Sequence, residues 1–136
     1  VLSDAHGLHI GQDDLPLIGA RSVLQTSQLV GRSSNNVDEA LQAQADGADY
    51  IAIGAVFPTN TMGKTSRKAV GIDAVREVKE SVSPPVVAIG GITVANAPDV
   101  VQSGADGIAV ASAVTMAADP ETATKQLLDT IEAARR

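Results

Sequence analysis

The stretch Ala48-Asp49-Tyr50-Ile51-Ala52-Ile53-Gly54 decides the fold, because its pattern occurs three times in the chain. A short apolar run, preceded by a turn-like dipeptide and followed by a small residue, recurs at 5–11 and at 105–111. Two similar runs lie at 28–33 and 85–90. Short runs rich in β-branched side chains and bounded by Gly or Pro are typical of strands buried on both faces. The sequence therefore predicts five buried strands.

A segment with helical spacing follows each run. Apolar residues three or four positions apart predict helices over 16–24, 37–45, 72–78, 94–101 and 123–131. Asn35 or Asn36 can cap the second helix, and Asp119-Pro120 begins the last one with a cap and a proline at the first helical position. Gly47 and Gly104 stand where helices commonly end.

Five βα units in 136 residues indicate an α/β fold, either an open doubly wound sheet or a (β/α)8 TIM barrel. Polar and glycine-rich residues cluster directly after the strands, where barrel enzymes have their sites, and this favours the barrel. A complete barrel takes at least about 200 residues. We therefore expect residues 1–136 to form a single domain, the C-terminal part of a barrel without its N-terminal βα units. Its open sheet edges could pair with a second copy, so a homo-oligomer remains an option.

Composition excludes several classes of function. The chain is 44% hydrophobic and 19% charged, and it has no cysteine, which excludes disulfides, a thiolate nucleophile and a cysteine metal site. A net charge of -6 argues against nucleic acid or an anionic membrane as partner. No run reaches the roughly 18 apolar residues of a membrane span, and no signal peptide is recognisable. We expect a cytoplasmic protein.

Two glycine-rich or small-residue loops indicate a phosphate site. Gly90-Gly91 follows the fourth run and Ala111-Ser112 follows the fifth. Glycines after a strand let backbone N–H groups approach an anion, and barrels often bind phosphate in the loops after their last two strands. Gly91, Ala111 and Ser112 are therefore predicted to face a phosphate. The alternative is that the glycines only permit tight turns.

Asp14 ends the stretch His9-Ile10-Gly11-Gln12-Asp13-Asp14 after the first run. A carboxylate at a strand end can hold Mg²⁺, which prefers oxygen ligands and bridges to substrate phosphates. The alternative is a helix-capping Asp14. His9 is interpreted as a barrel-interior or core histidine with a hydrogen bond.

The segment 56–68 is long for a βα connection, where two to six residues are usual. It is rich in hydroxyl groups and contains Lys64, Arg67 and Lys68, which could neutralise phosphate or pyrophosphate. The alternative is a solvated loop whose charges serve solubility. No Ser-His-Asp set or histidine cluster can be assembled from the sequence.

With these loops in place, the chain resembles the thiamine phosphate synthase family over nearly its whole length. The stretches that match the family are His9–Leu15, Gly31–Ser33, Gly47–Tyr50 with Gly54, Phe57–Thr61, Ile89–Ile92 with Asn96, and Gly104–Gly107. The resemblance implies a (β/α)8 barrel that joins hydroxymethylpyrimidine diphosphate to a thiazole phosphate. Pyrophosphate is released, together with CO₂ when the thiazole is carboxylated, and thiamine phosphate is formed.

The same resemblance implies roles for individual residues. Asp14 would be one of two Mg²⁺ ligands, and Ser33 would lie beside the pyrimidine and its diphosphate. Lys64 would replace the family's lysine, because Met62 stands at the usual position, and would assist the departure of pyrophosphate as a catalytic residue with Ser33. The thiazole phosphate would be bound by the residues Thr59, Thr61, Gly91, Ala111 and Ser112, and Asn60 would be a further substrate-binding residue.

Two other readings remain. Thiazole tautomerases share the fold and the phosphate site, but they have a proton-transferring His two residues beyond the serine, where this chain has Asn35. An amide cannot act as a general base near neutral pH. The third reading is a non-catalytic phosphate-binding fragment, since the family's N-terminal diphosphate contacts and second Mg²⁺ ligand have no counterpart among these residues. We expect the 136 residues alone to be inactive or nearly so.

Overall fold

The computed structural model describes residues 5–59 and 68–136. These residues form one five-stranded sheet in which strands and helices alternate along the chain. The elements are β1 (Gly7–Ile10), α1 (Leu17–Val23), β2 (Leu29–Ser34), α2 (Val37–Ala45), β3 (Tyr50–Gly54), α3 (Gly71–Ser81), β4 (Val86–Ile89), α4 (Ala97–Gln102), β5 (Gly107–Ala109), α5 (Ser112–Thr115) and α6 (Pro120–Ala134).

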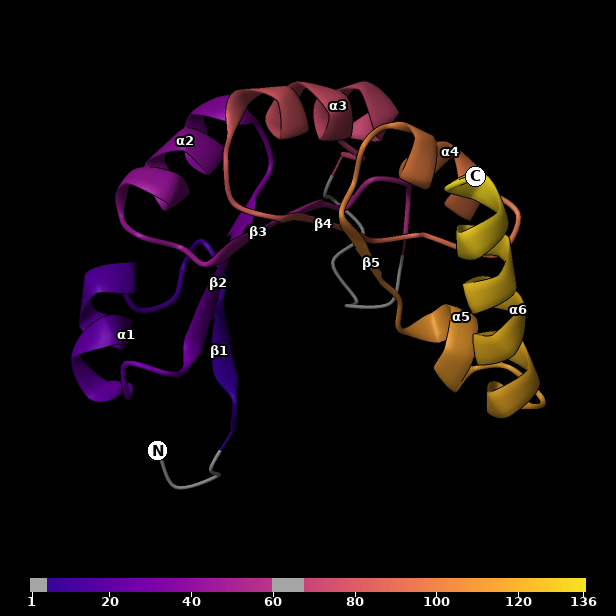
Figure 1. Cartoon of the computed structure of the whole chain (residues 1–136), viewed down its shortest axis with the longest axis horizontal. Coiled ribbons are helices and arrows are strands. Elements are labelled where there is room, and N and C mark those ends of the chain that lie inside the picture. The colour runs from indigo at the N-terminus through magenta and orange to yellow at the C-terminus, as the bar shows by residue number, and fades with distance from the viewer. Residues whose placement is uncertain (1–4, 60–67) are drawn as a thin grey trace.

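The sheet has the strand order β1-β2-β3-β4-β5, and every neighbouring pair is parallel. Figure 1 shows the sheet as the inner side of an arch, with the helices following one another around its outer side. Consecutive parallel strands joined by helices on a single face form part of a (β/α)8 barrel wall rather than a doubly wound sheet, which has helices on both faces. The predicted partial barrel of five βα units is confirmed.

The hydrophobic core lies between the sheet and the helices. Val30, Ile51, Ile53 and Val86 are fully buried on the strand side. The helices contribute residues at helical spacing to the same core, and these are Leu17, Ala20, Ala40, Ala43, Val75, Val78, Ala97, Val100 and Leu127. The helix-facing sides of β1 to β4 therefore contribute buried residues as the sequence indicates, whereas the residues of β5 are only partly buried.

Among the described residues the strands are more deeply buried on their helix-covered face than on the other face. Side chains alternate along a strand, and the register aligns Leu29 with Gly7 and aligns Ile89 with Gly54 on the concave side. Leu29 is 52% exposed and Ile89 is 45% exposed. No element within the described residues covers this side, so the concave face of the sheet is open.

The helices differ from the prediction in two places. The segment expected from residue 94 becomes helical only at Ala97, because Asn96 accepts the N–H of Thr93 at 2.7 Å and forms a turn there, and Val94 is exposed. The short helix α5 precedes α6 and was not predicted. Of the two candidate caps of α2, Asn36 is the cap, since its side chain accepts the N–H of Glu39.

Two aspartates brace the sheet at equivalent positions. Asp49 Oδ2 accepts the N–H of Val30 at 2.6 Å and pairs with Arg21. Asp106 Oδ2 accepts the N–H of Val86 at 2.7 Å and pairs with Lys79 at 2.7 Å. Each carboxylate thus ties its own strand to the preceding neighbour and to a helix, which explains why the Ala-Asp dipeptide recurs in the sequence.

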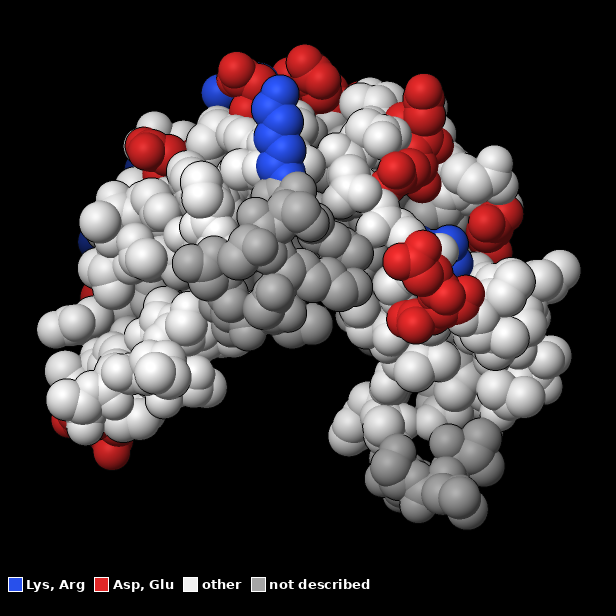
Figure 2. Space-filling view, turned by 180° about the vertical axis from the view of Figure 1, so that it is seen from behind, with Lys and Arg blue, Asp and Glu red and all other residues white. Residues whose placement is uncertain are grey.

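Acidic residues are concentrated on the convex surface of the arch, as seen from one side (Figure 2). In Figure 2 acidic side chains gather along the convex, helix-covered side, and uncharged residues border much of the hollow beneath the arch. None of the helices in the described part of the chain is long and apolar enough to cross a membrane.

Candidate functional site

A cavity of about 370 Å³ lies at the carboxyl ends of the strands. All five strands or the loops that follow them contribute to it, as expected for a barrel enzyme. Its lining residues are His9, Gln12, Ser33, Asn35, Gly54, Ala55, Thr59, Ile89, Gly90, Gly91, Ile92, Ala109, Val110, Ala111 and Ser112.

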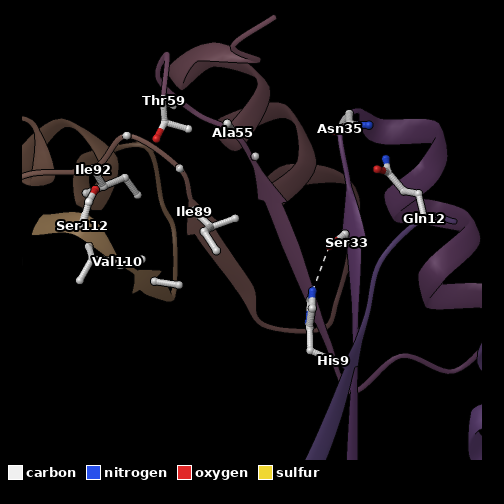
Figure 3. Close-up of a pocket in the computed structure, with 15 residues that line it drawn as sticks. His9, Gln12, Ser33, Asn35, Ala55, Thr59, Ile89, Ile92, Val110 and Ser112 are labelled. Carbon is white, nitrogen blue, oxygen red and sulfur yellow. Dashed lines mark hydrogen bonds between the residues drawn. The ribbon is translucent and has the colours of Figure 1, made fainter. Parts of the chain in front are cut away.

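The cavity has two polar ends with an apolar middle. Figure 3 shows His9, Ser33, Gln12 and Asn35 together on one side, contributed by β1, β2 and the loops after them. Thr59 and Ser112 lie on the other side, and Ile89 lies between the two groups. A cavity with this distribution of side chains can bind a polar group at each end and ring systems between them.

The end with Thr59 and Ser112 is shaped by close backbone packing. The N–H of Phe57 donates to the carbonyl of Gly90 at 3.0 Å, and the N–H of Val56 donates to the carbonyl of Ile89 at 2.9 Å. Asn96 donates to the carbonyl of Gly91 at 3.1 Å. The loops after β3 and β4 are therefore held together by hydrogen bonds at the cavity wall.

Gly91 is required by this packing. Its φ is +67°, a conformation that L side chains rarely adopt, and an added Cβ would be 2.8 Å from the carbonyl oxygen of Pro58. No other residue would fit without moving a neighbouring loop. This packing fits the alternative that the glycines permit a tight turn, and the phosphate contact at Gly91 stays a prediction.

The opposite end contains a hydrogen-bonded set of three side chains. His9 Nε2 is 2.9 Å from Ser33 Oγ, and His9 Nδ1 is 3.0 Å from the hydroxyl of Tyr50. The His9 and Tyr50 rings are stacked with centroids 5.6 Å apart. Partial burial lowers the pKa of His9, and the negative charge of Asp14 opposes that shift. A neutral imidazole is therefore favoured, and burial also raises the pKa of Tyr50, which keeps its hydroxyl protonated.

His9 is thus a barrel-interior residue with hydrogen bonds, one of the two interpretations made from sequence, but it also lines the cavity. The sequence does not predict this role, nor the presence of Gln12 and Asn35 in the lining. Gln12 donates to Glu39 Oε2 at 2.5 Å, and the N–H of Asn35 donates to the same oxygen at 2.7 Å. Glu39 on α2 therefore fixes the loops after β1 and β2 relative to each other.

Asp14 lies in the turn between β1 and α1 and does not line the cavity. Its Oδ2 accepts the N–H of Gly11 at 2.6 Å. No group of three or more His, Cys, Asp or Glu side chains suited to a metal occurs within residues 5–59 and 68–136. One carboxylate at a strand end nevertheless suits Mg²⁺, which binds through one or two carboxylates, waters and substrate phosphates. Asp14 fits such a partial site.

The structure brings together the predicted residues Ser33, Thr59, Gly91, Ala111 and Ser112 in one cavity. The predictions for Asn60, Thr61 and Lys64 fall on residues outside those that the structure describes. The described lining contains no Lys or Arg. A polyanionic ligand at this site therefore needs positive charge from elsewhere.

Comparisons with known proteins show what the chain as a whole is similar to. The family model described as thiamine monophosphate synthase matches residues 1–114. A thiamine-phosphate synthase from Natronomonas pharaonis is 45% identical over 130 residues, covering 95% of this chain and 61% of the relative. One from Methanocella arvoryzae is 50% identical over 125 residues, covering 92% and 58%.

A solved structure, thiamine phosphate pyrophosphorylase from Pyrococcus furiosus, superposes with a TM-score of 0.87 at 40% identity and covers 96% of this chain and 61% of that one. A 3-hexulose-6-phosphate synthase from Salmonella typhimurium, with a TM-score of 0.73 at 19% identity and coverage of 97% and 64%, shares the fold. The chain spans about three fifths of the length of the curated relatives it matches.

Proposed function

The chain belongs to the thiamine monophosphate synthase family, and we propose that the protein containing it is the transferase that forms thiamine phosphate. Its substrates are hydroxymethylpyrimidine diphosphate and a thiazole phosphate, with or without a carboxyl group on the thiazole. The products are thiamine phosphate and pyrophosphate, together with CO₂ in the carboxylated case.

The observation that supports this proposal most is the cavity with two polar ends. Ser33 and His9 form one end, Thr59 and Ser112 form the other, and Ile89 lies between them. Each substrate has a flat heteroaromatic ring and a phosphorylated group, so the two rings can meet over Ile89 while their phosphorylated groups point in opposite directions. A cavity with a single polar end would suit only one substrate.

We assign the two ends by the resemblance. Ser33 lies by the pyrimidine and its diphosphate. The thiazole phosphate is bound by the backbone at Gly91 and Ala111 and by the side chains of Thr59 and Ser112, with Asn60 and Thr61 as further contacts from the same loop. Lys64 supplies positive charge to the diphosphate, which the described lining lacks.

The reaction breaks the bond between the pyrimidine methylene carbon and the diphosphate oxygen, and the oxygen keeps the electron pair. The electron-rich pyrimidine stabilises the resulting cation, and the thiazole nitrogen donates its lone pair to form the new C–N bond. No covalent intermediate with the protein is needed. The residues of this chain hold the two rings in line and donate hydrogen bonds to the leaving group.

Mg²⁺ bound through Asp14 would neutralise charge on the departing pyrophosphate. The carboxylate of Asp14 is an appropriate ligand, and its place after β1 is on the same side of the sheet as the cavity. The remaining ligands would be waters and phosphate oxygens together with a second carboxylate.

The proposal is tested with the full-length protein. Pyrophosphate release is followed with both substrates, with each substrate alone, and with or without Mg²⁺. We expect release coupled one-to-one to thiamine phosphate, only when both substrates and Mg²⁺ are present. Hydrolysis of the pyrimidine diphosphate without thiamine phosphate, or no release at all from folded protein, would contradict the proposal. The 136-residue chain, assayed in parallel, is expected to show little or no turnover.

A thiazole tautomerase-like isomerase is the second candidate, because the imidazole of His9 provides a base in the cavity. Against it, Asn35 occupies the position expected of that family's proton-transferring histidine. Isomerisation of carboxythiazole phosphate alone, measured without any pyrimidine substrate, separates the two candidates.

A further inference from the structure

Three side chains from three neighbouring strands form a continuous hydrogen-bonded series behind the polar end of the cavity. The series runs from Tyr50 on β3 through His9 on β1 to Ser33 on β2, with distances of 3.0 Å and 2.9 Å. His9 and Ser33 line the cavity and Tyr50 does not. The tyrosine is therefore placed to act on a ligand only through the other two residues.

The register of the sheet explains how β1 and β3 side chains can meet across β2. Gly31 is the partner of His9 in one ladder and of Tyr50 in the other, so the three residues lie in one row on the same face. Because Gly31 has no side chain, the Tyr50 ring occupies the space above it and stacks with His9. Figure 3 shows the His9 ring directed toward Ser33, with the hydrogen bond between them drawn as a dashed line.

A neutral imidazole donates a hydrogen bond through one nitrogen and accepts one through the other. One of the two hydroxyl groups must therefore donate to the ring, and the other must accept from it. If Tyr50 donates to Nδ1, then Nε2–H donates to Ser33 Oγ and the hydrogen of Ser33 remains free. In the opposite arrangement Ser33 donates to Nε2, and only its oxygen lone pairs face the cavity.

We propose that Tyr50 and His9 are positioning residues that set the Ser33 hydroxyl as a donor toward the diphosphate of the pyrimidine substrate. This inference rests on the proposed function. Two arguments favour the stated direction. A phenol is more acidic than an aliphatic alcohol and is the better donor to an imidazole, and diphosphate oxygens only accept hydrogen bonds.

In this arrangement His9 does not act as a general base. With Nε2 already protonated and bonded to Ser33, the imidazole has no lone pair available to the cavity. Its contribution is to fix the Ser33 hydroxyl, which touches substrate, and an isomerase mechanism through His9 is disfavoured.

The first experiment is nitrogen-15 NMR of the His9 imidazole in the full-length protein without substrates, with the signals assigned by their loss in His9→Gln. We expect the Nε2–H tautomer to predominate at a pH where the ring is neutral. A predominant Nδ1–H tautomer would overturn the inference. This readout does not depend on whether the protein makes thiamine phosphate, so the proposed function can fail separately.

The second experiment is a double-mutant cycle with Tyr50→Phe and Ser33→Ala, read as affinity for pyrophosphate in the presence of Mg²⁺ and as kcat/KM for the pyrimidine substrate. We expect Tyr50→Phe to reduce both by about five- to tenfold, the effect of one hydrogen bond. In the Ser33→Ala background Tyr50→Phe should have almost no further effect. Multiplicative losses, or wild-type values for Tyr50→Phe, would overturn the inference.

A matched control keeps a general loss of structure from imitating this result. His6 lies on the same chain segment, is exposed, and does not line the cavity. His6→Asn should leave the affinity for pyrophosphate and kcat/KM for the pyrimidine substrate unchanged, and circular dichroism should show that Tyr50→Phe and Ser33→Ala are folded. Where Tyr50→Phe is not folded, it is replaced by 3-fluorotyrosine at position 50. That analogue keeps the ring and strengthens the donor, and it is expected to preserve the Nε2–H tautomer and pyrophosphate affinity. A shift to Nδ1–H would overturn the inference.

Discussion

The ring of Tyr50 lies directly over Gly31, so that a Cβ atom added at position 31 would be 1.9 Å from Tyr50 Cζ. The two residues are register partners on adjacent strands, β2 and β3. The absence of a side chain at position 31 is thus what lets Tyr50 reach His9 across the sheet.

Gly31→Ala is expected to displace the Tyr50 ring and to lower the free energy of unfolding by about 1–3 kcal/mol, the usual cost of overpacking. Loss of the His9–Tyr50 contact should accompany it. Denaturant unfolding measures the first effect, and the nitrogen-15 signals of His9 report the second. Gly107→Ala is the control, since its Cβ would be an ordinary 3.5 Å from Val87 Cγ2. Equal destabilisation by the two substitutions would refute the argument.

Gly91→Ala should abolish tight binding at the predicted thiazole phosphate end. A Cβ there would be 2.8 Å from Phe57 Cβ and 2.8 Å from the oxygen of Pro58, so the loop after β3 has to move. We expect at least about a tenfold loss of affinity for thiazole phosphate, the effect of losing one charge-assisted hydrogen bond, measured by calorimetry.

Gly47→Ala is the matched control for that experiment. Gly47 also has a positive φ, +88°, but no atom lies within 4 Å of its added Cβ. The substitution should cost about 1–2 kcal/mol of stability from backbone strain and leave phosphate affinity unchanged. If Gly47→Ala weakened thiazole phosphate binding as much as Gly91→Ala, the loss of affinity would come from backbone strain and not from displacement of the loop after β3.

The braces formed by Asp49 and Asp106 predict how stability depends on pH. Burial by itself raises the pKa of Asp106, but the hydrogen bonds from Lys79 and from the N–H of Val86, with the charges of Lys79 and Arg135, outweigh it and hold the pKa below 3.8. Burial also raises the pKa of Asp49, but the hydrogen bonds from Val30 and Arg21 and the charge of Arg21 outweigh it and lower that pKa. The unfolded chain therefore binds these protons first, and stability is expected to fall as pH drops below about 3.8.

Asp106→Asn should lower the free energy of unfolding by about 1 kcal/mol at neutral pH, because a charge-assisted hydrogen bond to Val86 is weakened. The variant should also lose part of its pH dependence below pH 4, where the wild-type carboxylate becomes protonated. Asp73→Asn is the control, since Asp73 pairs with Arg76 at the exposed surface and such pairs contribute less than about 1 kcal/mol. Parallel pH profiles of wild type and Asp106→Asn would contradict the assignment.

Hydrophobic periodicity was sufficient to predict the order of the main elements. Strand runs such as Ile51–Ile53 and helical positions such as Val75 and Val78 pack against each other as the pattern indicates. The glycine loop after β4 and Ser112 after β5 could be placed in one cavity because carboxyl ends of parallel strands meet at one edge of the sheet.

The stagger between strands could not be predicted from the repeats. Aligning the repeated stretches puts His9 opposite Ala52 and Gly107 opposite Tyr50. The observed ladders instead place His9 in the row of Tyr50, and Gly107 in the row of Ala52. In both cases the observed partner lies two residues away from the one that the repeat alignment predicts. A stagger of this kind is required for a sheet to close into a barrel. The Tyr50–His9–Ser33 series depends on that shift and is therefore invisible in the sequence.

Asp14→Asn separates the two roles that its carboxylate can have. Oδ2 accepts the N–H of Gly11 at 2.6 Å, and an Asn side chain keeps an oxygen for this bond while removing the charge that a metal ligand needs. Stability should therefore change little. The Mg²⁺ concentration that gives half-maximal pyrophosphate release by the full-length protein should rise by about 10- to 100-fold.

Asp13→Asn is the control, because Asp13 is an exposed neighbour and its substitution changes the net charge by the same amount. If both variants shifted the Mg²⁺ requirement equally, the effect would come from the general electrostatic field and Asp14 would not be a ligand. If Asp14→Asn lost stability but kept its Mg²⁺ requirement, the carboxylate would serve only the turn after β1. If only Asp14→Asn raised the Mg²⁺ requirement, the two carboxylates would differ as expected. Asp14 would coordinate the metal directly, and Asp13 would not.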